Sequence, residues 1–346
     1  MTQRSISEID NLQNKNVLVR IDSDVDIKND TILDDTRLLS SLETIEYIIN
    51  HGGNAILIGH LGRPDGKINP EYSLEIVAKW YAKRFKGAVK QETLEEFSCW
   101  KITDNLLLLE NIRFNKGEEE NDEAFAKKLA SLGDIFVNEA FAVSHRAHAT
   151  TVGIAKLLPS YAGFHLQKEV KTLENVMKNP KRPLAVLIGG AKIETKLPIV
   201  EKMHHIADYV LVGGKIAEET KILIKVQHEK IVGHKSAVLV ADNTIDGLDI
   251  TDKDAENFMQ IMALCKTIVW NGPVGKMGDP KTEANSLKIA KSIIDSGAYS
   301  VVGGGDSLTL LEQHHLLNKF SFVSTGGGAM LEFLSGKKLP GISILE

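Results

Sequence analysis

Arginine is absent from the last 164 residues of this sequence. The last arginine of the 346 residues is Arg182, whereas several glycine clusters lie after it. Arginine binds a carboxylate or phosphate through two parallel hydrogen bonds, while a glycine cluster exposes backbone N–H groups to a phosphate. The absence excludes a guanidinium anion site from the second half. It predicts a first half that binds a small anion with side chains and a second half that holds phosphates with backbone.

Cysteine is scarce and strong net charge is missing. Cys99 and Cys265 are far apart and in no metal-ligand spacing, which excludes a disulfide framework and fits a reducing compartment. The formal charge of −5 gives no overall attraction to nucleic acid or to an anionic membrane. Any cationic site must therefore be a local cluster, and we expect no nucleic-acid partner.

Long apolar stretches are missing as well. Residues 1–16 are polar and lack the apolar core of a signal peptide. Later apolar runs are far shorter than the roughly 20 residues that cross a bilayer. These absences predict a cytoplasmic protein without a membrane partner.

Short apolar runs alternate with helix-patterned segments along the chain. The runs are Val17–Ile21, Ala55–Ile58, Leu106–Leu109, Ile135–Val137, Leu184–Ile188, Tyr209–Val212, Thr267–Trp270, Tyr299–Val302 and Phe320–Val323. Runs with little polar alternation are typical of strands buried on both faces, and helical crossovers make neighbouring strands parallel. The sequence predicts an α/β fold with its strands divided over two Rossmann-like parallel sheets.

A helix is expected between the two halves. Leu166, Val170, Leu173 and Met177 recur at helical spacing, and the pattern stops at Asn179-Pro180. We therefore predict domains at 1–162 and 180–331, joined by an interdomain helix at 163–179. Residues 332–346 form a tail that must dock elsewhere.

Glycine clusters follow the apolar runs of the second domain. They begin at Gly189, Gly213, Gly272, Gly303 and Gly326. A single Gly-Gly can be a tight turn without a ligand, but several at strand ends in one domain favour a phosphate site. None completes a Walker loop or a G-x-G-x-x-G motif, so neither a P-loop enzyme nor a dinucleotide dehydrogenase is supported.

Charged residues beside these clusters suggest phosphoryl chemistry. Asp306 can hold Mg²⁺ carried by nucleotide phosphates, or it can be a helix N-cap. Lys192 and Lys196, four residues apart, can neutralise a phosphoryl group in transfer, or they can be solvated lysines near a helix start. Lysine, arginine and Mg²⁺ at the transfer point can supply most of such catalysis.

In the first half, Arg37, Arg63, Arg113 and Arg146 lie just after apolar runs or near helix starts. Each taken singly is more consistent with a surface salt bridge, but several at one sheet edge would favour an anion site. His145 and His148 flank Arg146, which would repel a metal cation, so they fit an anion site better than a metal site. No G-x-S-x-G motif is present, and covalent catalysis is not indicated.

These motifs, in this order, resemble the phosphoglycerate kinase family nearly end to end, from the run Val17–Asp22 to Leu339-Pro340-Gly341. The resemblance implies phosphoryl transfer between 1,3-bisphosphoglycerate and MgADP in glycolysis, giving 3-phosphoglycerate and ATP. It implies a monomer with ATP or ADP as co-substrate and Mg²⁺ as cofactor. The first domain would bind 3-phosphoglycerate, the second would bind nucleotide, and the tail would return to the first domain.

The resemblance also implies site residues. Those for the glycerate phosphate are Asp22, Asp24, Arg37, His60, Leu61, Gly62, Arg63, Arg113 and Arg146. Those for the nucleotide are Lys192, Lys196, Gly213, Asn271, Gly304, Gly305, Asp306 and Ser307, with Asp306 also as metal ligand. Arg37 and Lys196 would be catalytic, because domain closure would bring both to the same phosphoryl group and exclude water.

The sequence departs from the family pattern at several positions. Asp-Phe-Asn-Val-Pro is replaced by Asp22-Ser23-Asp24-Val25-Asp26, and like charges there should weaken substrate binding unless an arginine offsets them. Glu194-Thr195 replaces Ser-Asp, Lys215 replaces a glycine, and Gly278 replaces a glutamate expected to hold the ribose. The second domain is shortened between Ala217 and Asp249. The alternative is therefore a catalytically weakened relative with altered nucleotide or acceptor specificity.

Overall fold

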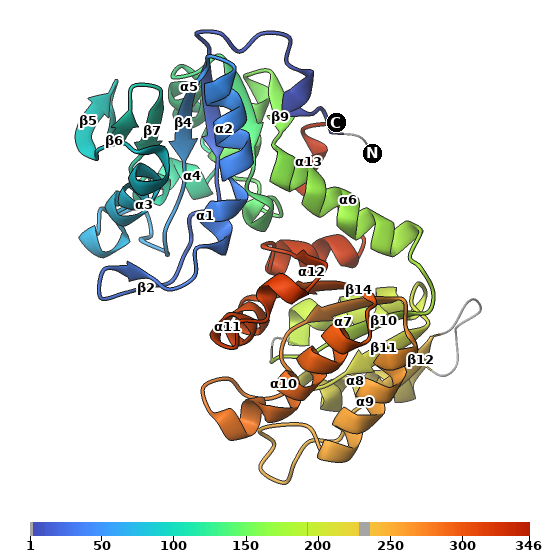
Figure 1. Cartoon of the computed structure of the whole chain (residues 1–346). Coiled ribbons are helices and arrows are strands. Elements are labelled where there is room, and N and C mark those ends of the chain that lie inside the picture. Colours follow the sequence, from blue (N-terminus) through green and yellow to red (C-terminus); the bar gives the residue numbers. More distant parts are fainter. Residues whose placement is uncertain (1–2, 192, 228–235) are drawn as a thin grey trace. The chain divides into compact units, whose positions relative to one another are not determined.

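The computed structural model describes residues 3–191, 193–227 and 236–346. It divides into two compact units, each with its own sheet and core (Figure 1). Unit 1 runs to Val170 and includes Lys338–Glu346, while unit 2 is Lys171–Lys337. The border between them falls inside helix α6 (Phe164–Lys178). Helix α6 corresponds to the helix predicted at 163–179, and the border between the two units lies in the middle of α6.

Unit 1 is built on a seven-stranded sheet in the order β5-β6-β7-β4-β1-β8-β9. Its strands are β1 (Asn16–Arg20), β4 (Asn54–Ile58), β5 (Lys90–Leu94), β6 (Phe97–Thr103), β7 (Leu106–Leu109), β8 (Ile135–Asn138) and β9 (Ser160–Ala162). A separate hairpin joins β2 (Ile27–Lys28) and β3 (Thr31–Ile32), and the helices are α1 (Thr36–Ser40), α2 (Leu42–Asn50), α3 (Glu75–Phe85), α4 (Lys116–Glu119), α5 (Glu123–Ala130) and α13 (Pro340–Ser343).

The parallel strands of unit 1 follow the Rossmann order. β1 is central and pairs in parallel with β4 and β8, so that Val19 is opposite both Leu57 and Val137. β7 and β9 extend the parallel part at its two sides, whereas β5 and β6 pair antiparallel at one edge. Those two strands were not predicted, because β5 contains no buried residue and polar residues interrupt the apolar residues of β6, so neither gives a continuous apolar run.

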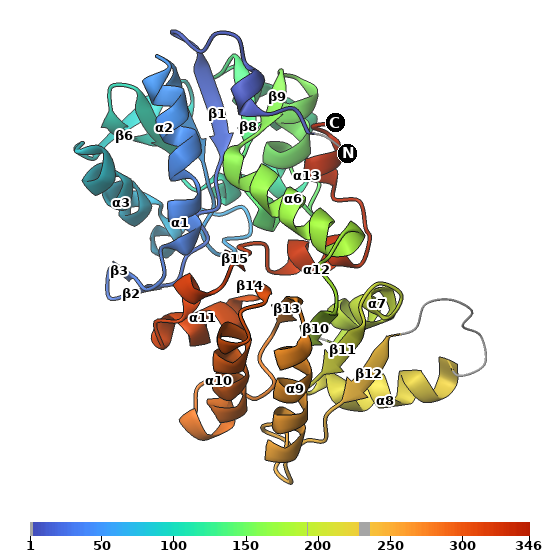
Figure 2. The ribbon, with the colours of Figure 1, turned by 45° about the vertical axis from the view of Figure 1, so that its right-hand side comes forward.

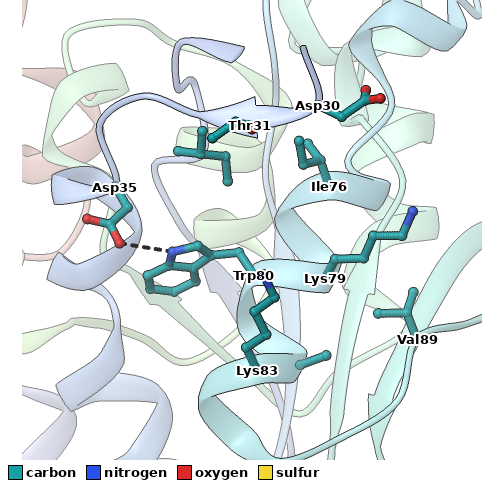
Figure 3. Close-up of a pocket in the computed structure, with 10 residues that line it drawn as sticks. Asp30, Thr31, Asp35, Ile76, Lys79, Trp80, Lys83 and Val89 are labelled. Atoms are coloured by element: carbon teal, nitrogen blue, oxygen red, sulfur yellow. Dashed lines mark hydrogen bonds between the residues drawn. The ribbon is translucent and has the colours of Figure 1, made fainter. Parts of the chain in front are cut away.

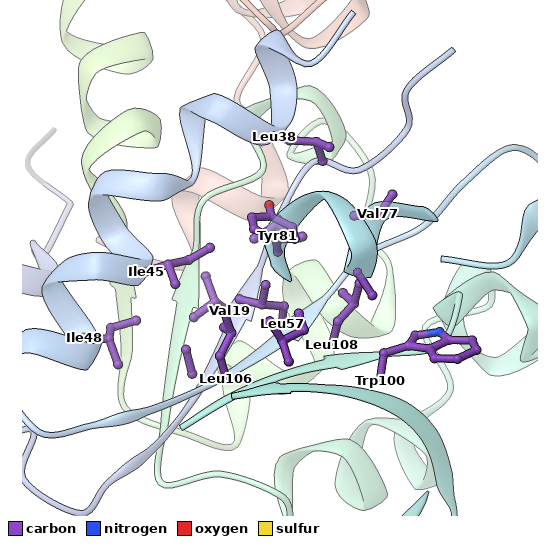
Figure 4. Packing of buried hydrophobic residues seen from close by; sticks show 14 of the residues in the cluster. Val19, Leu38, Ile45, Ile48, Leu57, Val77, Tyr81, Trp100, Leu106 and Leu108 are labelled. Carbon is purple, nitrogen blue, oxygen red and sulfur yellow. The ribbon is translucent and has the colours of Figure 1, made fainter. Parts of the chain in front are cut away.

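Both faces of this sheet are covered by helices. Val17, Val19 and Leu57 pack on one face against α2 and α3, and Figure 4 shows Ile45, Ile48, Val77 and Tyr81 pointing toward the strands. Leu18 and Ile56, which alternate with them, pack on the other face against α5. Burial on both faces explains why the central strands are nearly continuous apolar runs.

Unit 2 carries a six-stranded sheet in which every neighbouring pair is parallel, in the order β12-β11-β10-β13-β14-β15. The strands are β10 (Leu184–Ile188), β11 (Tyr209–Val212), β12 (Ala237–Val240), β13 (Thr267–Asn271), β14 (Tyr299–Gly303) and β15 (Phe322–Val323). The helices are α7 (Ile193–His204), α8 (Ile216–Gln227), α9 (Asp252–Leu264), α10 (Pro280–Asp295), α11 (Gly305–Gln313) and α12 (Gly328–Leu334). This order, 3-2-1-4-5-6, is the Rossmann arrangement.

The unit 2 core is organised in the same way. Leu187, Ile268 and Trp270 pack against Phe258 of α9 and Ile289 of α10. Helix α7 lies next to α8 and to α12 (Figure 2). The predicted fold class, α/β with parallel sheets, is confirmed. No helix in the described ranges combines the length and the apolar character that a membrane-spanning segment needs.

Because the core of unit 1 is closely packed, we expect Ile48→Ala to lower its free energy of unfolding by about 2–5 kcal/mol. Ile48 is 0% exposed, whereas Ile68 is 82% exposed. The same substitution at Ile68 should therefore cost no more than about 0.5 kcal/mol. Urea unfolding followed by tryptophan fluorescence measures both, and equal effects would contradict the assigned core.

Candidate active site

The predicted anion residues of unit 1 gather at the carboxyl edge of its sheet. Asp22 and Asp24 follow β1, His60 to Arg63 follow β4, Arg113 follows β7 and Arg146 follows β8. Since β1, β4, β7 and β8 are parallel, these four segments reach the same edge. Arg37 lies on α1 and reaches the edge through Asp22 and Asp24.

Arg37 is paired with two carboxylates. Its Nε lies 3.5 Å from Asp22 Oδ2, and its Nη1 lies 3.9 Å from Asp24 Oδ2 and donates to the Asp24 carbonyl. The Asp22 carboxylate raises the pKa of Arg37 further, while burial raises the pKa of Asp22 against the opposing effect of Arg37. Arg37 therefore stays charged, and this one guanidinium faces two carboxylates.

His60 is a neutral member of this cluster. Its side chain is buried, and burial together with Arg20, Arg113, Arg146 and Arg37 holds its pKa well below the usual value. Arg20 Nη2 lies 3.0 Å from His60 Nδ1, and an arginine can only donate. His60 Nδ1 is thus the acceptor, and the ring proton is on Nε2, 3.8 Å from Asp24 Oδ2.

Arg113 is a buried cation with unused donor capacity. Its side chain is 2% exposed, its Nη1 donates to Gly62 O at 2.9 Å, and its Nε lies 3.2 Å from Glu119 Oε1. Nη2 has no hydrogen-bond partner among the described residues. A buried donor without an acceptor is costly, so this group is suited to receive an oxygen of an anionic ligand.

The remaining predicted residues of unit 1 differ in exposure. Leu61 is buried, and its carbonyl accepts from Asn111 Nδ2 at 2.7 Å. Arg146 is half-buried, with its Nε 3.3 Å from His145 Nε2. Arg63 is exposed and makes no hydrogen bond or ion pair with the part of the chain that is described. Only the position of Arg63 after β4 therefore places it at this edge.

Arg20 is a candidate site residue that the sequence reasoning missed. It is fully buried at the end of β1 and donates to Thr150 Oγ1, to backbone carbonyls and to His60. Glu118, also fully buried, accepts from Thr150. The sequence could have indicated Arg20, because it stands at the end of the apolar run of β1. A charge at such a buried position needs hydrogen-bond partners.

A separate hollow of about 570 Å³ lies between the β2–β3 hairpin and α3 and contains none of the predicted site residues. On its wall Trp80 Nε1 donates to Asp35 Oδ2 at 3.0 Å (Figure 3). Asp35 precedes α1, and at the other end of α1 Ser41 Oγ lies 2.7 Å from Tyr81 OH. Two contacts to α3 thus fix the short helix that carries Arg37.

In unit 2 the predicted glycine clusters follow β10, β11, β13, β14 and β15 at the carboxyl edge of the all-parallel sheet. A pocket of about 270 Å³ opens there. It is lined by Gly190, Ala191, Gly214, Lys215, Gly247, Leu248, Pro273, Val274, Gly275, Lys276, Met277 and Asp306. Four of the lining residues are glycines, whose backbone N–H groups a phosphate can approach closely.

Lys196 is buried on α7 and directed at this edge. Its Nζ donates to Gly189 O and lies 3.4 Å from Asn271 O. Lys192 lies outside the described residues. Asn271 is buried at the end of β13, and a Cβ on Gly304 would be 3.2 Å from its Oδ1. The structure thus brings Lys196, Asn271 and Gly304 together.

The last predicted residues lie around α11 and β11. Asp306 is exposed in the first turn of α11 and reaches the pocket, whereas Gly305 faces open space. Ser307 is fully buried, and its Oγ has no hydrogen-bond partner among the described residues. Gly213 lies under the pocket, where a Cβ would be 2.8 Å from Val274.

Gly278, which replaces the glutamate expected to hold the ribose, lies in the loop after β13. Gly278 has φ +100°, a conformation that favours glycine, and its N–H donates to Glu283 Oε1 at 2.6 Å. Glu283 is buried at the start of α10. Lys276, in the same loop, lines the pocket and was not predicted. Its only sequence signal is its closeness to Asn271-Gly272-Pro273.

The unit 2 pocket can hold a metal ion that is already bound to nucleotide phosphates. No cluster of three or more His, Cys, Asp or Glu side chains suited to a metal ion occurs within the described ranges. Magnesium that travels with a nucleotide needs one or two protein carboxylates, and the phosphates supply the other oxygens. Asp306, the carboxylate on the pocket wall, fits that requirement.

Comparison with known proteins decides the family. The phosphoglycerate kinase family model matches residues 6–236 and 216–337. The chain belongs to the phosphoglycerate kinase family. The predicted enzyme class, a kinase of glycolysis, is confirmed at this level.

Two phosphoglycerate kinases, from Borreliella burgdorferi and Finegoldia magna, are each 36% identical to this chain, with all of both chains covered. The phosphoglycerate kinase structure from Coxiella burnetii has a TM-score of 0.79 at 34% identity and covers 99% of each chain. The structure from Pyrococcus horikoshii has a TM-score of 0.81 at 27% identity and covers 99% of this chain and 98% of that one.

The comparisons also locate a difference in length. The alignment with the Borreliella relative has 394 positions, which is 48 more than the 346 residues of this chain. The two stretches matched by the phosphoglycerate kinase model overlap at residues 216–236. Apart from its first residue, this overlap falls in the segment between Ala217 and Asp249, where the second domain is expected to be shortened.

Gly189 provides a test of the close backbone packing under the nucleotide pocket. A Cβ there would lie 2.3 Å from Pro273 O and 2.5 Å from Gly272 O, and neither backbone atom can give way easily. We expect Gly189→Ala to destabilise unit 2 by about 1–3 kcal/mol. Gly305→Ala, which meets nothing within 4 Å, is the control and should not destabilise. Urea unfolding of the two variants measures the difference, and equal stability would refute the packing argument.

Proposed function

We propose that this chain transfers a phosphoryl group between the acyl phosphate of 1,3-bisphosphoglycerate and MgADP, forming 3-phosphoglycerate and ATP. The observation that carries the proposal is Arg113, a buried guanidinium whose Nη2 lacks an acceptor among the described residues, in a cluster with Arg37, Arg146 and neutral His60. Such a cluster fits a small phosphorylated carboxylate, because guanidinium groups bind both of its charged ends.

In this proposal unit 1 binds the glycerate phosphate. Arg113 Nη2 and Arg146 donate to the acceptor's anionic groups, and the Nε2 proton of neutral His60 adds a donor without a full charge. Arg63, exposed at the same edge, adds a further cation. Asp22, 2% exposed and paired with Arg37, holds that guanidinium in position.

Unit 2 binds the nucleotide. The glycine backbone around Gly190, Gly214 and Gly304 lets phosphates approach closely, and Asp306 holds Mg²⁺ that arrives with them. When bound, Mg²⁺ neutralises phosphate charge that builds up during transfer. Asn271 and the buried Ser307 Oγ supply polar contacts next to that backbone.

Phosphoryl transfer needs positioning and charge stabilisation more than covalent chemistry. We assign this role to Arg37 from unit 1 and Lys196 from unit 2, so the proposal requires that acceptor and nucleotide meet during the reaction. Lys196 Nζ rests on the carbonyls of Gly189 and Asn271 and would exchange these contacts for phosphoryl oxygens. The exclusion of water during this step would protect the acyl phosphate from hydrolysis.

We also propose that the chain is a cytoplasmic monomer without nucleic-acid or membrane partners. We propose that residues 1–162 and the tail 332–346 bind the acceptor, and that residues 180–331 bind the nucleotide. The tail contacts the unit 1 sheet, since the Gly341 carbonyl accepts from Asn138 Nδ2 at 3.0 Å.

A coupled assay of 3-phosphoglycerate phosphorylation, with ATP and GTP compared, tests the function. We expect turnover by the natural chain and a loss of about 100-fold or more in kcat for Lys196→Ala, with a much smaller change in KM. The reason is that the ammonium group acts mainly on charge that develops in the transition state. Arg37→Ala should behave similarly.

Lys202→Ala, on the exposed side of the same helix α7, is the matched control and should keep full turnover. Unchanged turnover in Lys196→Ala would remove Lys196 from the mechanism. No turnover by the natural chain with either nucleotide would refute the proposed substrates.

Lys215 tests the altered nucleotide pocket. Its exposed side chain lines the pocket together with Gly214, Pro273 and other residues, so a bound nucleotide must order it or displace it. We expect Lys215→Gly to bind MgADP more tightly by a few-fold, up to about tenfold, because the cost of ordering a lysine side chain is removed. Titration calorimetry measures it beside Lys266→Gly, an exposed lysine outside the pocket. Weaker MgADP binding in Lys215→Gly would show that the lysine attracts the nucleotide instead.

A further inference from the structure

Asp24 places a carboxylate inside the cationic cluster of unit 1. Its Oδ1 accepts from the Gly62 backbone N–H at 2.9 Å, and its Oδ2 lies 3.9 Å from Arg37 Nη1 and 3.8 Å from His60 Nε2. A backbone amide, a guanidinium and an imidazole N–H are the donors that an anionic ligand would use. Asp24 therefore occupies, from within the chain, part of an anion site.

The two aspartates of the cluster differ in freedom. The Asp22 side chain is 2% exposed, whereas that of Asp24 is 42% exposed. Asp24 can turn into solvent and be hydrated there, while Asp22 cannot leave Arg37 without becoming a buried unpaired charge. Asp24 is thus the carboxylate that a ligand can displace.

The charges give the displacement a consequence. The positive charge of Arg37 is shared by two carboxylates, and His60 is neutral. While Asp24 stays in place, neither group therefore offers an anionic ligand an uncompensated positive charge. An acceptor carrying a phosphate and a carboxylate adds further negative charge beside Asp24. Like charges a few ångströms apart repel appreciably in a partly buried site.

We propose that Asp24 is a resident anion that competes with the acceptor for Arg37, His60 and the Gly62 N–H, and so sets a weak affinity for anionic acceptors. The inference depends on the proposed function, since it takes the acceptor site to be this cluster. It assigns Asp24 a role opposite to that of the arginines around it. The side chain accepts from the Gly62 N–H and faces Arg37 and His60 until the acceptor arrives, and it must then turn away.

The test is Asp24→Asn, which keeps an oxygen that can accept from Gly62 and removes the charge. We expect both the Kd and the KM for the acceptor, 3-phosphoglycerate, to fall by about tenfold, as the loss of one nearby like charge implies. The KM for the nucleotide should not change. The acceptor KM of the variant should also rise more steeply with salt than that of the natural chain, because its site carries more net positive charge.

Asp26→Asn is the matched control. Asp26 is exposed two residues further on, and its side chain makes no hydrogen bond or ion pair with the residues that the structure describes. This variant removes the same charge from the same loop and should leave the acceptor affinity within about twofold of the natural value. A similar gain in both variants would mean that general charge, rather than the contacts of Asp24, sets the affinity, and would overturn the proposal.

Calorimetric titration with 3-phosphoglycerate gives the Kd, and thermal unfolding shows whether each variant is folded. Unchanged or weaker binding in Asp24→Asn would also overturn the inference. If that variant does not fold, Asp24→Ser, which is also neutral, decides by the same criterion. If the natural chain neither binds nor phosphorylates 3-phosphoglycerate, the proposed function itself fails, and this outcome is distinct from a natural chain that is active but insensitive to Asp24→Asn.

Discussion

Parallel pairing of strands is the constraint on which both candidate sites depend. A parallel strand must be followed by a crossover, so the segments after β1, β4, β7 and β8 all start at one edge of the unit 1 sheet. The same holds for the glycine clusters after the strands of unit 2. Side chains more than 100 residues apart in the chain, such as Arg20 and Thr150, come into contact for this reason.

The edge of unit 1 is stabilised as a network rather than as separate ion pairs. Arg20 is fully buried, and it is tolerated because Thr150, backbone carbonyls and His60 accept its donors. The same arrangement keeps His60 neutral with its proton on Nε2. The network therefore fixes both the positions and the protonation of the groups at this edge. Arg113 Nη2, which has no hydrogen-bond partner among the described residues, stays available to a ligand.

The edge of unit 2 relies on close backbone packing instead. Glycine at Gly189 lets β10 and the loop after β13 approach closely, and the buried Lys196 ammonium lies against both. The departures from the family pattern fall around this packing rather than within it. Lys215 and Lys276 add cations to the pocket wall, and Gly278 donates to Glu283 in a turn that a larger residue would strain.

Each apolar run that the sequence shows contains a strand, because a strand buried on both faces must be continuously apolar. The antiparallel strands β5 and β6 were not predicted because polar residues interrupt both of them, and β5 at the edge buries no residue. The short apolar strand β12 was omitted, although the same reasoning could have predicted it. The sequence alone thus determined the α/β class, the separation of arginine from glycine clusters and the family. Only the tertiary structure decided that Asp24 lies among Arg37, His60 and Gly62, that His60 is neutral and that Arg20 belongs to the site. These properties depend on distances and burial between segments that are remote in the chain, and a sequence pattern contains neither.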